Sequence, residues 1–131
     1  MKHVYFEGRE LRPWSEYLES DELKVGEVYF TLQYLDSQTF IPQLIPLVFI
    51  GKNLDPDDDD MLYFQETSSY IGGVRPYEDG VTCAVEPGAL EVVVHTMKSR
   101  DCRAMTYDSA LNDLLLCALR RQHNAGNSSK V

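Results

Sequence analysis

The chain has 131 residues, of which 44% are hydrophobic, and a formal net charge of -9. This length and composition suit one folded domain with its own core and argue against a disordered chain. The negative charge opposes contact with the phosphates of nucleic acid, so we expect no nucleic-acid partner.

No apolar run in the sequence reaches the length of a membrane span, and we expect no membrane contact. Residues 1–10 include charged side chains where a signal peptide would be apolar. The three cysteines form no CxxC pair and do not indicate a disulfide framework. Together these features favour a cytoplasmic protein.

The N-terminal part predicts three elements. Residues 3–6 have the pattern of a short strand, and residues 13–18 that of a short helix with proline in its first turn. Trp14 and Leu18 would share the buried face of that helix. Residues 25–35 alternate between apolar and polar side chains, which predicts a half-buried strand.

A dense acidic run, Asp55-Pro56-Asp57-Asp58-Asp59-Asp60, separates two apolar segments, residues 47–50 and 61–65. The first segment is apolar on both faces, which is typical of an interior strand, whereas the prolines that precede it cannot donate to a central ladder. Carboxylates packed this densely repel one another unless water and counterions screen them. The sequence therefore predicts an antiparallel hairpin with the aspartates at its exposed tip.

The second half predicts a loop, two strands and a helix. Residues 67–80 are rich in Ser, Gly and Pro, which is typical of a long surface loop. Strands are expected at residues 81–85 and 90–96. After Thr106, a residue type favoured at the N-cap, apolar residues recur at helical spacing. Residues 124–131 are polar and are expected to form a disordered tail.

These elements predict a single α+β domain over residues 1–123. Its sheet of about six strands would be antiparallel and strongly bent, or would form a partly closed small barrel. The C-terminal helix would pack on the sheet, and the short N-terminal helix would cover one end.

The acidic run also has part of the pattern of a calcium-binding EF-hand. Asp55, Asp57 and Asp59 occupy the first three ligand positions, and Glu66 occupies the last. However, Asp60 stands where the EF-hand loop needs glycine, and both flanks predict strands instead of helices. We therefore expect no metal site and no cofactor, and only weak binding of a divalent cation is left open.

The sequence shows no recognisable catalytic signature. Cys102 lies between Arg100 and Arg103, whose charges would favour its thiolate form. Against this, Asp101 is adjacent and no element of the sequence supplies an oxyanion hole. We assign no catalytic residue.

Two groups of side chains favour contact with another protein. The first is the acidic surface, which would attract a basic partner; it consists of Asp55, Asp57, Asp58, Asp59 and Asp60.

The second group consists of Tyr29 and Tyr63, on the strand face opposite the expected core, and Leu116, on the otherwise polar face of the C-terminal helix. If these side chains are exposed, they would anchor an interface. The alternative is a sheet that is covered on both faces and buries them.

Three functional hypotheses follow. The first is a non-enzymatic acidic protein-binding module, such as a cytosolic antagonist of a basic partner protein. The alternative is a small enzyme or ligand-binding protein in which Arg75 and Tyr77, of the 67–80 loop, hold an anionic or aromatic ligand. The third is a homo-oligomeric structural subunit that associates through Tyr29, Tyr63 or Leu116.

Overall fold

The computed structural model describes residues 2–3, 8–77 and 93–128. A four-stranded antiparallel sheet forms the centre of the molecule, with the strands in the order β1-β2-β3-β4. The strands are β1 (Val28–Tyr34), β2 (Pro42–Lys52), β3 (Met61–Glu66) and β4 (Val94–Lys98). The helical elements are η1 (Ser20–Glu22), α1 (Thr67–Ile71), η2 (Ser99–Asp101) and α2 (Tyr107–Ser128).

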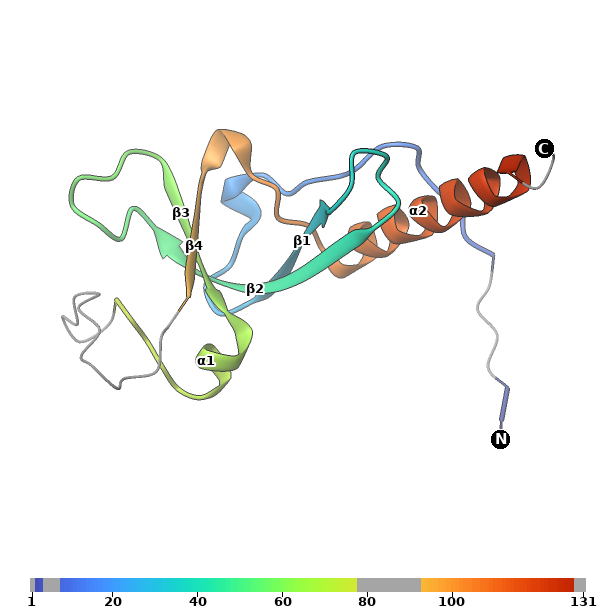
Figure 1. Cartoon of the computed structure of the whole chain (residues 1–131). Coiled ribbons are helices and arrows are strands. Elements are labelled where there is room, and N and C mark those ends of the chain that lie inside the picture. Colours follow the sequence, from blue (N-terminus) through green and yellow to red (C-terminus); the bar gives the residue numbers. More distant parts are fainter. Residues whose placement is uncertain (1, 4–7, 78–92, 129–131) are drawn as a thin grey trace.

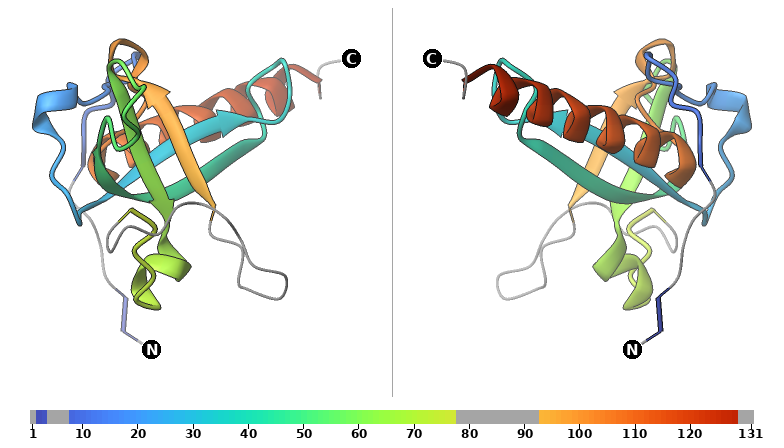
Figure 2. Two further views of the ribbon diagram at one scale, coloured as in Figure 1. Left: turned by 90° about the vertical axis from the view of Figure 1, so that its left-hand side faces the viewer. Right: turned by 90° about the vertical axis from the view of Figure 1, so that its right-hand side faces the viewer.

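The predicted α+β class with a bent antiparallel sheet and a C-terminal helix is confirmed. The sheet curls into a half-barrel, and α2 lies along β1 and β2 (Figures 1 and 2). The chain between β4 and α2 crosses back to the free edge of β1, where Phe30 and Met105 exchange two backbone hydrogen bonds of 2.8 and 2.9 Å. This single bridge partly closes the sheet.

The hairpin predicted from the acidic run is also confirmed. β2 pairs with β3 from Leu47 opposite Glu66 to Lys52 opposite Leu62, and residues 53–60 form the connection. The register shifts between Phe49 and Gly51. Such a bulge bends the strand locally and contributes to the curl of the sheet.

β2 is longer than predicted because its prolines lie within the strand. Pro46 is opposite Phe30, whose backbone N–H and C=O point to Met105 instead of β2. The pair of Phe30 and Pro46 is therefore not hydrogen-bonded, and Pro46 has no ladder bond to donate to β1. The same alternation places Pro42 opposite Tyr34 without such a bond.

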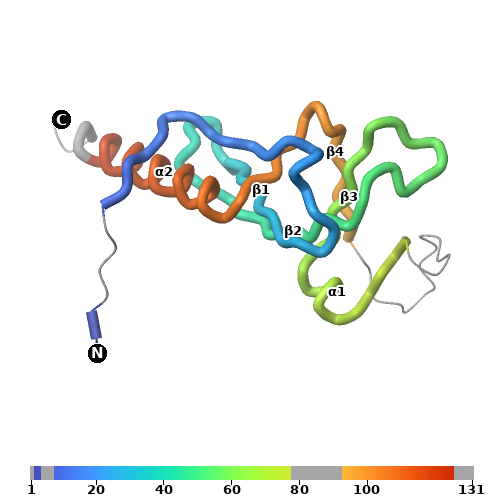
Figure 3. The backbone as a smooth tube through the Cα atoms, turned by 180° about the vertical axis from the view of Figure 1, so that it is seen from behind, coloured from blue at the N-terminus to red at the C-terminus, as the bar shows by residue number. Residues whose placement is uncertain are grey.

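The prediction of a short N-terminal helix was wrong. Residues 13–18 are not helical, Trp14 is exposed, and only the 3-10 turn η1 follows. The backbone of this segment is held by distant groups: Arg12 exchanges two hydrogen bonds of 3.0 Å with the amide of Asn112, and the N–H of Leu18 donates to the carbonyl of Ala104. These bonds replace those within a helix, and the segment runs extended beside α2 (Figure 3).

The prediction of about six strands was also wrong, since the described residues contain four. The strand expected at 81–85 and most of that at 3–6 lie outside the described residues, and the strand expected at 90–96 is described as β4 from Val94. The expected loop at 67–80 opens with the helix α1. α2 continues to Ser128, so residues 124–128 are helical instead of disordered.

The α2 N-terminus forms as predicted. The hydroxyl Oγ1 of Thr106 accepts a hydrogen bond of 3.2 Å from the N–H of Ser109, the third residue of the helix. This is the bond that an N-cap threonine supplies to an otherwise unpaired N–H.

The hairpin is buried on both of its faces. On the inner face, Phe49, Leu62 and Phe64 belong to the main core, and the rings of Phe49 and Phe64 lie 5.4 Å apart. On the outer face, Tyr63 and Gln65 are buried as well.

Candidate functional site

The acidic run has an ordered backbone at the hairpin tip. The N–H of Asn53 donates to the carbonyl of Met61, and the side-chain oxygen of Asn53 accepts from the N–H of Met61, both at 2.8 Å. Asn53 and Asp60 have positive φ angles of 52° and 57°, which turn the chain at each end of the tip. The backbone of the tip therefore forms a defined loop.

The five aspartates of the tip have different roles. Asp55, Asp57 and Asp59 are exposed, and no ion pair to their carboxylates is found within the described part of the chain. Asp58 is half-buried: its Oδ2 accepts hydrogen bonds from the N–H of Asp55 and from the hydroxyl of Tyr63. Asp58 therefore ties the tip to β3.

Basic side chains partly neutralise one edge of the tip. Lys52 forms an ion pair of 3.1 Å with Asp60, and the Nζ of Lys98 donates to the carbonyl of Asp59 at 2.6 Å. A hydrogen bond with Ser99, the ion pair with Lys52 and the charge of Lys98 hold the pKa of Asp60 below its usual value. Three carboxylates, not five, are thus left free for an outside partner.

Of the two alternatives for Tyr29 and Tyr63, exposure or burial, burial is the one that holds. Tyr29 and Tyr63 are only 8% and 4% exposed. Tyr29 packs in the main core, and its hydroxyl accepts a hydrogen bond of 2.8 Å from the N–H of Lys24. Tyr29 lies on the core face of the sheet and not opposite it as expected, whereas Tyr63 lies on the outer face, which is covered as well. Neither tyrosine presents an anchor to a partner.

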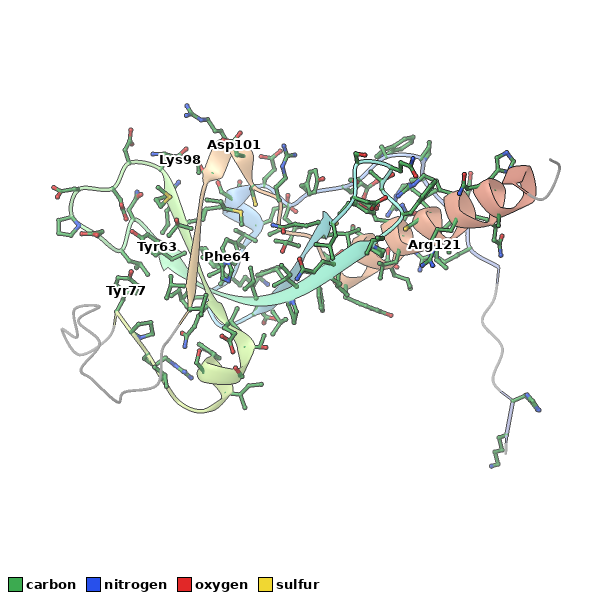
Figure 4. The ribbon with its side chains drawn as sticks, viewed as in Figure 1. Tyr63, Phe64, Tyr77, Lys98, Asp101 and Arg121 are labelled. Atoms are coloured by element: carbon green, nitrogen blue, oxygen red, sulfur yellow. The ribbon has the colours of Figure 1, made fainter. Side chains whose placement is uncertain are left out.

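The chain after β3 covers the outer face of the hairpin. The ring of Tyr77 packs edge-on against that of Tyr63 at a centroid distance of 5.2 Å, and the two lie together beside β3 (Figure 4). Burial and the nearby Asp58 raise the pKa of Tyr63, so its hydroxyl stays protonated and donates to that carboxylate.

A small pocket of about 100 Å³ lies between this cover and the hairpin. Its apolar walls are Val25, Ile50, Leu54 and Pro76. Its other lining residues are Gln65, Tyr70, Arg75 and Tyr77, so the structure brings the two residues of the ligand-binding hypothesis, Arg75 and Tyr77, to one cavity.

Gln65 is the one lining residue that is completely buried. Its amide Nε2 donates to the hydroxyl of Ser69 and to the carbonyl of Val74, both at 3.0 Å. Its Oε1 is buried and has no hydrogen-bond partner among the residues that the structure describes. A buried acceptor without a partner costs about 1–3 kcal/mol.

Arg75 is fixed by its own segment. Its Nη1 donates to the carbonyls of Tyr70 and Val74 at 2.8 and 2.9 Å, and its guanidinium lies 3.6 Å from the centre of the Tyr70 ring. Such stacking and chelation form a planar, rigid wall. The described residues provide no carboxylate partner for Arg75.

The C-terminal helix buries polar side chains that the sequence predicted on an exposed face. The polar residues Asn112 and Asp113 are buried against the N-terminal segment, where Asp113 accepts a hydrogen bond of 2.6 Å from Ser15. Tyr107 of the apolar stripe is 67% exposed, and Leu116 is half-buried. The interface hypothesis for Leu116 therefore has only a partly accessible side chain.

A shallow apolar groove of about 100 Å³ also lies between α2 and the β1–β2 pair. It is lined by Phe30, Leu44, Tyr107, Ala110, Leu111 and Leu114. The hydroxyl of Tyr107 is the one polar side-chain group among these lining residues, so the groove offers little to orient a small ligand.

Neither a metal centre nor a reactive thiol stands out in the described residues. Within them, no three His, Cys, Asp or Glu side chains are grouped so as to hold a metal ion. Residues 55–66 form a hairpin flanked by β2 and β3, which is not the helix–loop–helix of an EF-hand. Cys102 is buried, and burial raises the pKa of its thiol, which opposes its use as a nucleophile.

Sequence reasoning missed Gln65 and the walls contributed by Val25 and Leu54. One signal was available, since Gln65 has the same strand parity as Tyr63 and must share its face. The walls come from three separate segments, and no local pattern relates them.

Comparison with known proteins gives no further assignment, because no family model, curated protein or solved structure matches this chain. In the residues that the structure describes, no helix is both long and apolar enough to cross a membrane.

Proposed function

We propose that this protein is a non-enzymatic binding module that docks a basic protein through the acidic hairpin tip. The observation that carries the proposal is that the five aspartates of the tip differ in their contacts. Asp58 and Asp60 are bonded to the protein's own side chains, whereas Asp55, Asp57 and Asp59 face solvent on the same ordered loop.

An ordered loop with three free carboxylates suits recognition of a cationic surface. The backbone is already fixed, so binding costs little ordering of the loop. Carboxylates at an exposed tip act over a long range and steer a positively charged partner toward the loop. The partner class that fits is a basic protein in the cytosol, and inhibition of that protein is the simplest consequence of such docking.

The test is capture of partners from the native lysate by three immobilised proteins: the wild type, a tip variant and a control variant. The tip variant carries Asp55→Asn, Asp57→Asn and Asp59→Asn. The control variant carries the same change in net charge at exposed acids elsewhere, Glu10→Gln, Asp21→Asn and Glu27→Gln.

We expect the wild type and the control to retain the same basic protein and the tip variant to lose it. Retention should also be lost at high salt, since the Debye length falls from about 10 Å at 0.1 M to about 3 Å at 1 M. Equal retention by the tip and control variants would refute docking through the tip.

A further inference from the structure

We infer that an open hollow beside the hairpin tip is a binding site for a phosphate group, either as free phosphate or as a small phosphate ester. The hollow has a volume of about 510 Å³ and is lined by Lys52, Asn53, Asp59, Asp60, Lys98 and Arg100. The inference does not depend on the docking function proposed for the tip.

The fold brings three cations to this hollow from separate elements. Lys52 ends β2, Lys98 ends β4 beside the tip, and Arg100 lies in η2 (Figure 4). β2 and β4 flank β3 in the sheet, so the ends of both strands meet where the tip joins β3. Among the lining residues the cations outnumber the carboxylates by three to two, although the whole chain has a net charge of -9.

Two of these cations keep their charge. Lys52 is neutralised by Asp60 at 3.1 Å, but the Nζ of Lys98 donates to a backbone carbonyl at 2.6 Å, which positions the ammonium without cancelling its charge. The side chain of Arg100 is 78% exposed, and its Nε lies 3.9 Å from Asp101, a distance typical of a weak surface pair. Lys98 and Arg100 can therefore both pair with an anion.

The donors in the lining suit phosphate. A phosphate ester carries a charge of about -1.5 to -2 at pH 7 and has three strong acceptor oxygens. Lysine and arginine are the side chains that bind such oxygens in proteins. The amide of Asn53 adds a neutral donor, because its oxygen is occupied by the N–H of Met61. The hollow is larger than one phosphate group and has room for the polar remainder of a small ester.

Asp59 opposes binding and gives the inference a sign that can be measured. Its exposed carboxylate lines the same hollow and repels an anion, whereas the carboxylate of Asp60 is already paired with Lys52. Removal of the charge of Asp59 should therefore strengthen phosphate binding, and removal of the charge of Lys98 or Arg100 should weaken it.

The probes are inorganic phosphate and glycerol phosphate, each titrated into the full-length protein at pH 7 and followed by two-dimensional ¹H–¹⁵N NMR. Sodium chloride at equal ionic strength is the reference for screening. We expect saturable shifts of the backbone signals of Asn53, Lys98 and Arg100 with both probes and not with chloride. Tighter binding of glycerol phosphate would identify an ester as the ligand, and equal binding would identify the phosphate group alone.

Three variants and a control locate the effect. Lys98→Gln and Arg100→Gln should each weaken phosphate binding by about fivefold, the upper range for an exposed ion pair. Asp59→Asn should strengthen it by a similar factor. Lys24→Gln, at an exposed lysine outside the hollow, makes the same change in net charge as Lys98→Gln and should bind phosphate as the wild type does.

Three results would overturn the inference. The first is that chloride produces the same shifts as phosphate, and the second is that Lys98→Gln and Lys24→Gln bind phosphate equally. The third is an Asp59→Asn variant whose affinity is no higher than that of the wild type. Each variant changes a side chain at the surface of the hollow or outside it, so its unchanged NMR signals elsewhere verify that it folds.

Discussion

The β2–β3 hairpin carries two candidate sites that differ in whether their polar groups are exposed to water or buried. At the tip, Asp55, Asp57 and Asp59 keep their charges in water, and the loop is held by backbone and Asn53 bonds. On the outer face, Gln65 is fully buried, and its Oε1 has no hydrogen-bond partner in the described part of the chain. The tip therefore suits long-range, salt-sensitive attraction of a large partner, whereas the pocket suits direct contact with a small one.

The hairpin core supports both sites, so a cavity there should disturb both. Phe64 of β3 is completely buried in the main core. Phe64→Ala should lower the free energy of unfolding by about 3–5 kcal/mol, measured by urea denaturation. Ile71→Ala, at a side chain that is 83% exposed, is the control and should change it by less than about 0.5 kcal/mol. A similar small effect of both changes would contradict the assigned core.

The bulge in β2 should be the next most sensitive point. Gly51 has φ of 151°, and a Cβ there would lie 2.7 Å from Cδ2 of Leu54, which is a wall of the pocket. Gly51→Ala should cost about 1–3 kcal/mol in unfolding free energy, measured by urea denaturation, because Leu54 must move.

Gly8→Ala is the matched control for that experiment. A Cβ at Gly8 would meet nothing within 4 Å, and no change in stability is expected. If both alanine variants behave as the wild type, the bulge geometry is incorrect.

Tyr63 connects the two sites, because its hydroxyl binds Asp58 of the tip while its ring packs on Tyr77 at the pocket. Tyr63→Phe keeps the ring and removes the donor, so it should cost about 0.5–1.5 kcal/mol in unfolding free energy. The NMR signals of the tip residues should shift relative to those of the wild type. A variant as stable as the wild type, with the tip signals unmoved, would show that this bond contributes nothing.

The smallest expected effect is a pH dependence that belongs to the tip alone. A hydrogen bond with Ser99 and the ion pair with Lys52 lower the folded-state pKa of Asp60 from 3.8. A lowered folded pKa gives stability that is present above the unfolded value and is lost as the pH falls through the folded one.

Unfolding free energies measured from about pH 6 to about pH 2 should therefore fall less steeply for Asp60→Asn than for the wild type. Ile71→Ala, which changes no titratable group, should retain the wild-type slope. Identical slopes for Asp60→Asn and the wild type would show that the ion pair of Asp60 with Lys52 contributes nothing to this pH dependence.

Local patterns predicted the elements that local forces create. The charge density of residues 55–60 predicted the tip, and the spacing after Thr106 predicted α2 with its N-cap. The extended path of Arg12 to Leu18 was missed because its bonds come from Asn112 and Ala104, far along the chain. A pattern read from neighbouring residues cannot identify partners that lie so far apart in the sequence.

The candidate sites were predictable to different degrees for the same reason. Exposure of the acidic run follows from its own charge, whereas the ion pair of Asp60 depends on Lys52 across the hairpin. Arg75 and Tyr77 were identified as loop residues with recognition chemistry, but their cavity requires Val25 and Gln65 from other elements. Only the assembled fold places these residues together.

The most direct test of docking through the tip is the fraction of the basic partner retained by the tip variant relative to the charge-matched control variant at low salt. The account predicts that the control retains as much as the wild type and the tip variant retains little or none. Equal retention by the two variants would show that net charge alone governs binding and would contradict the role assigned to Asp55, Asp57 and Asp59.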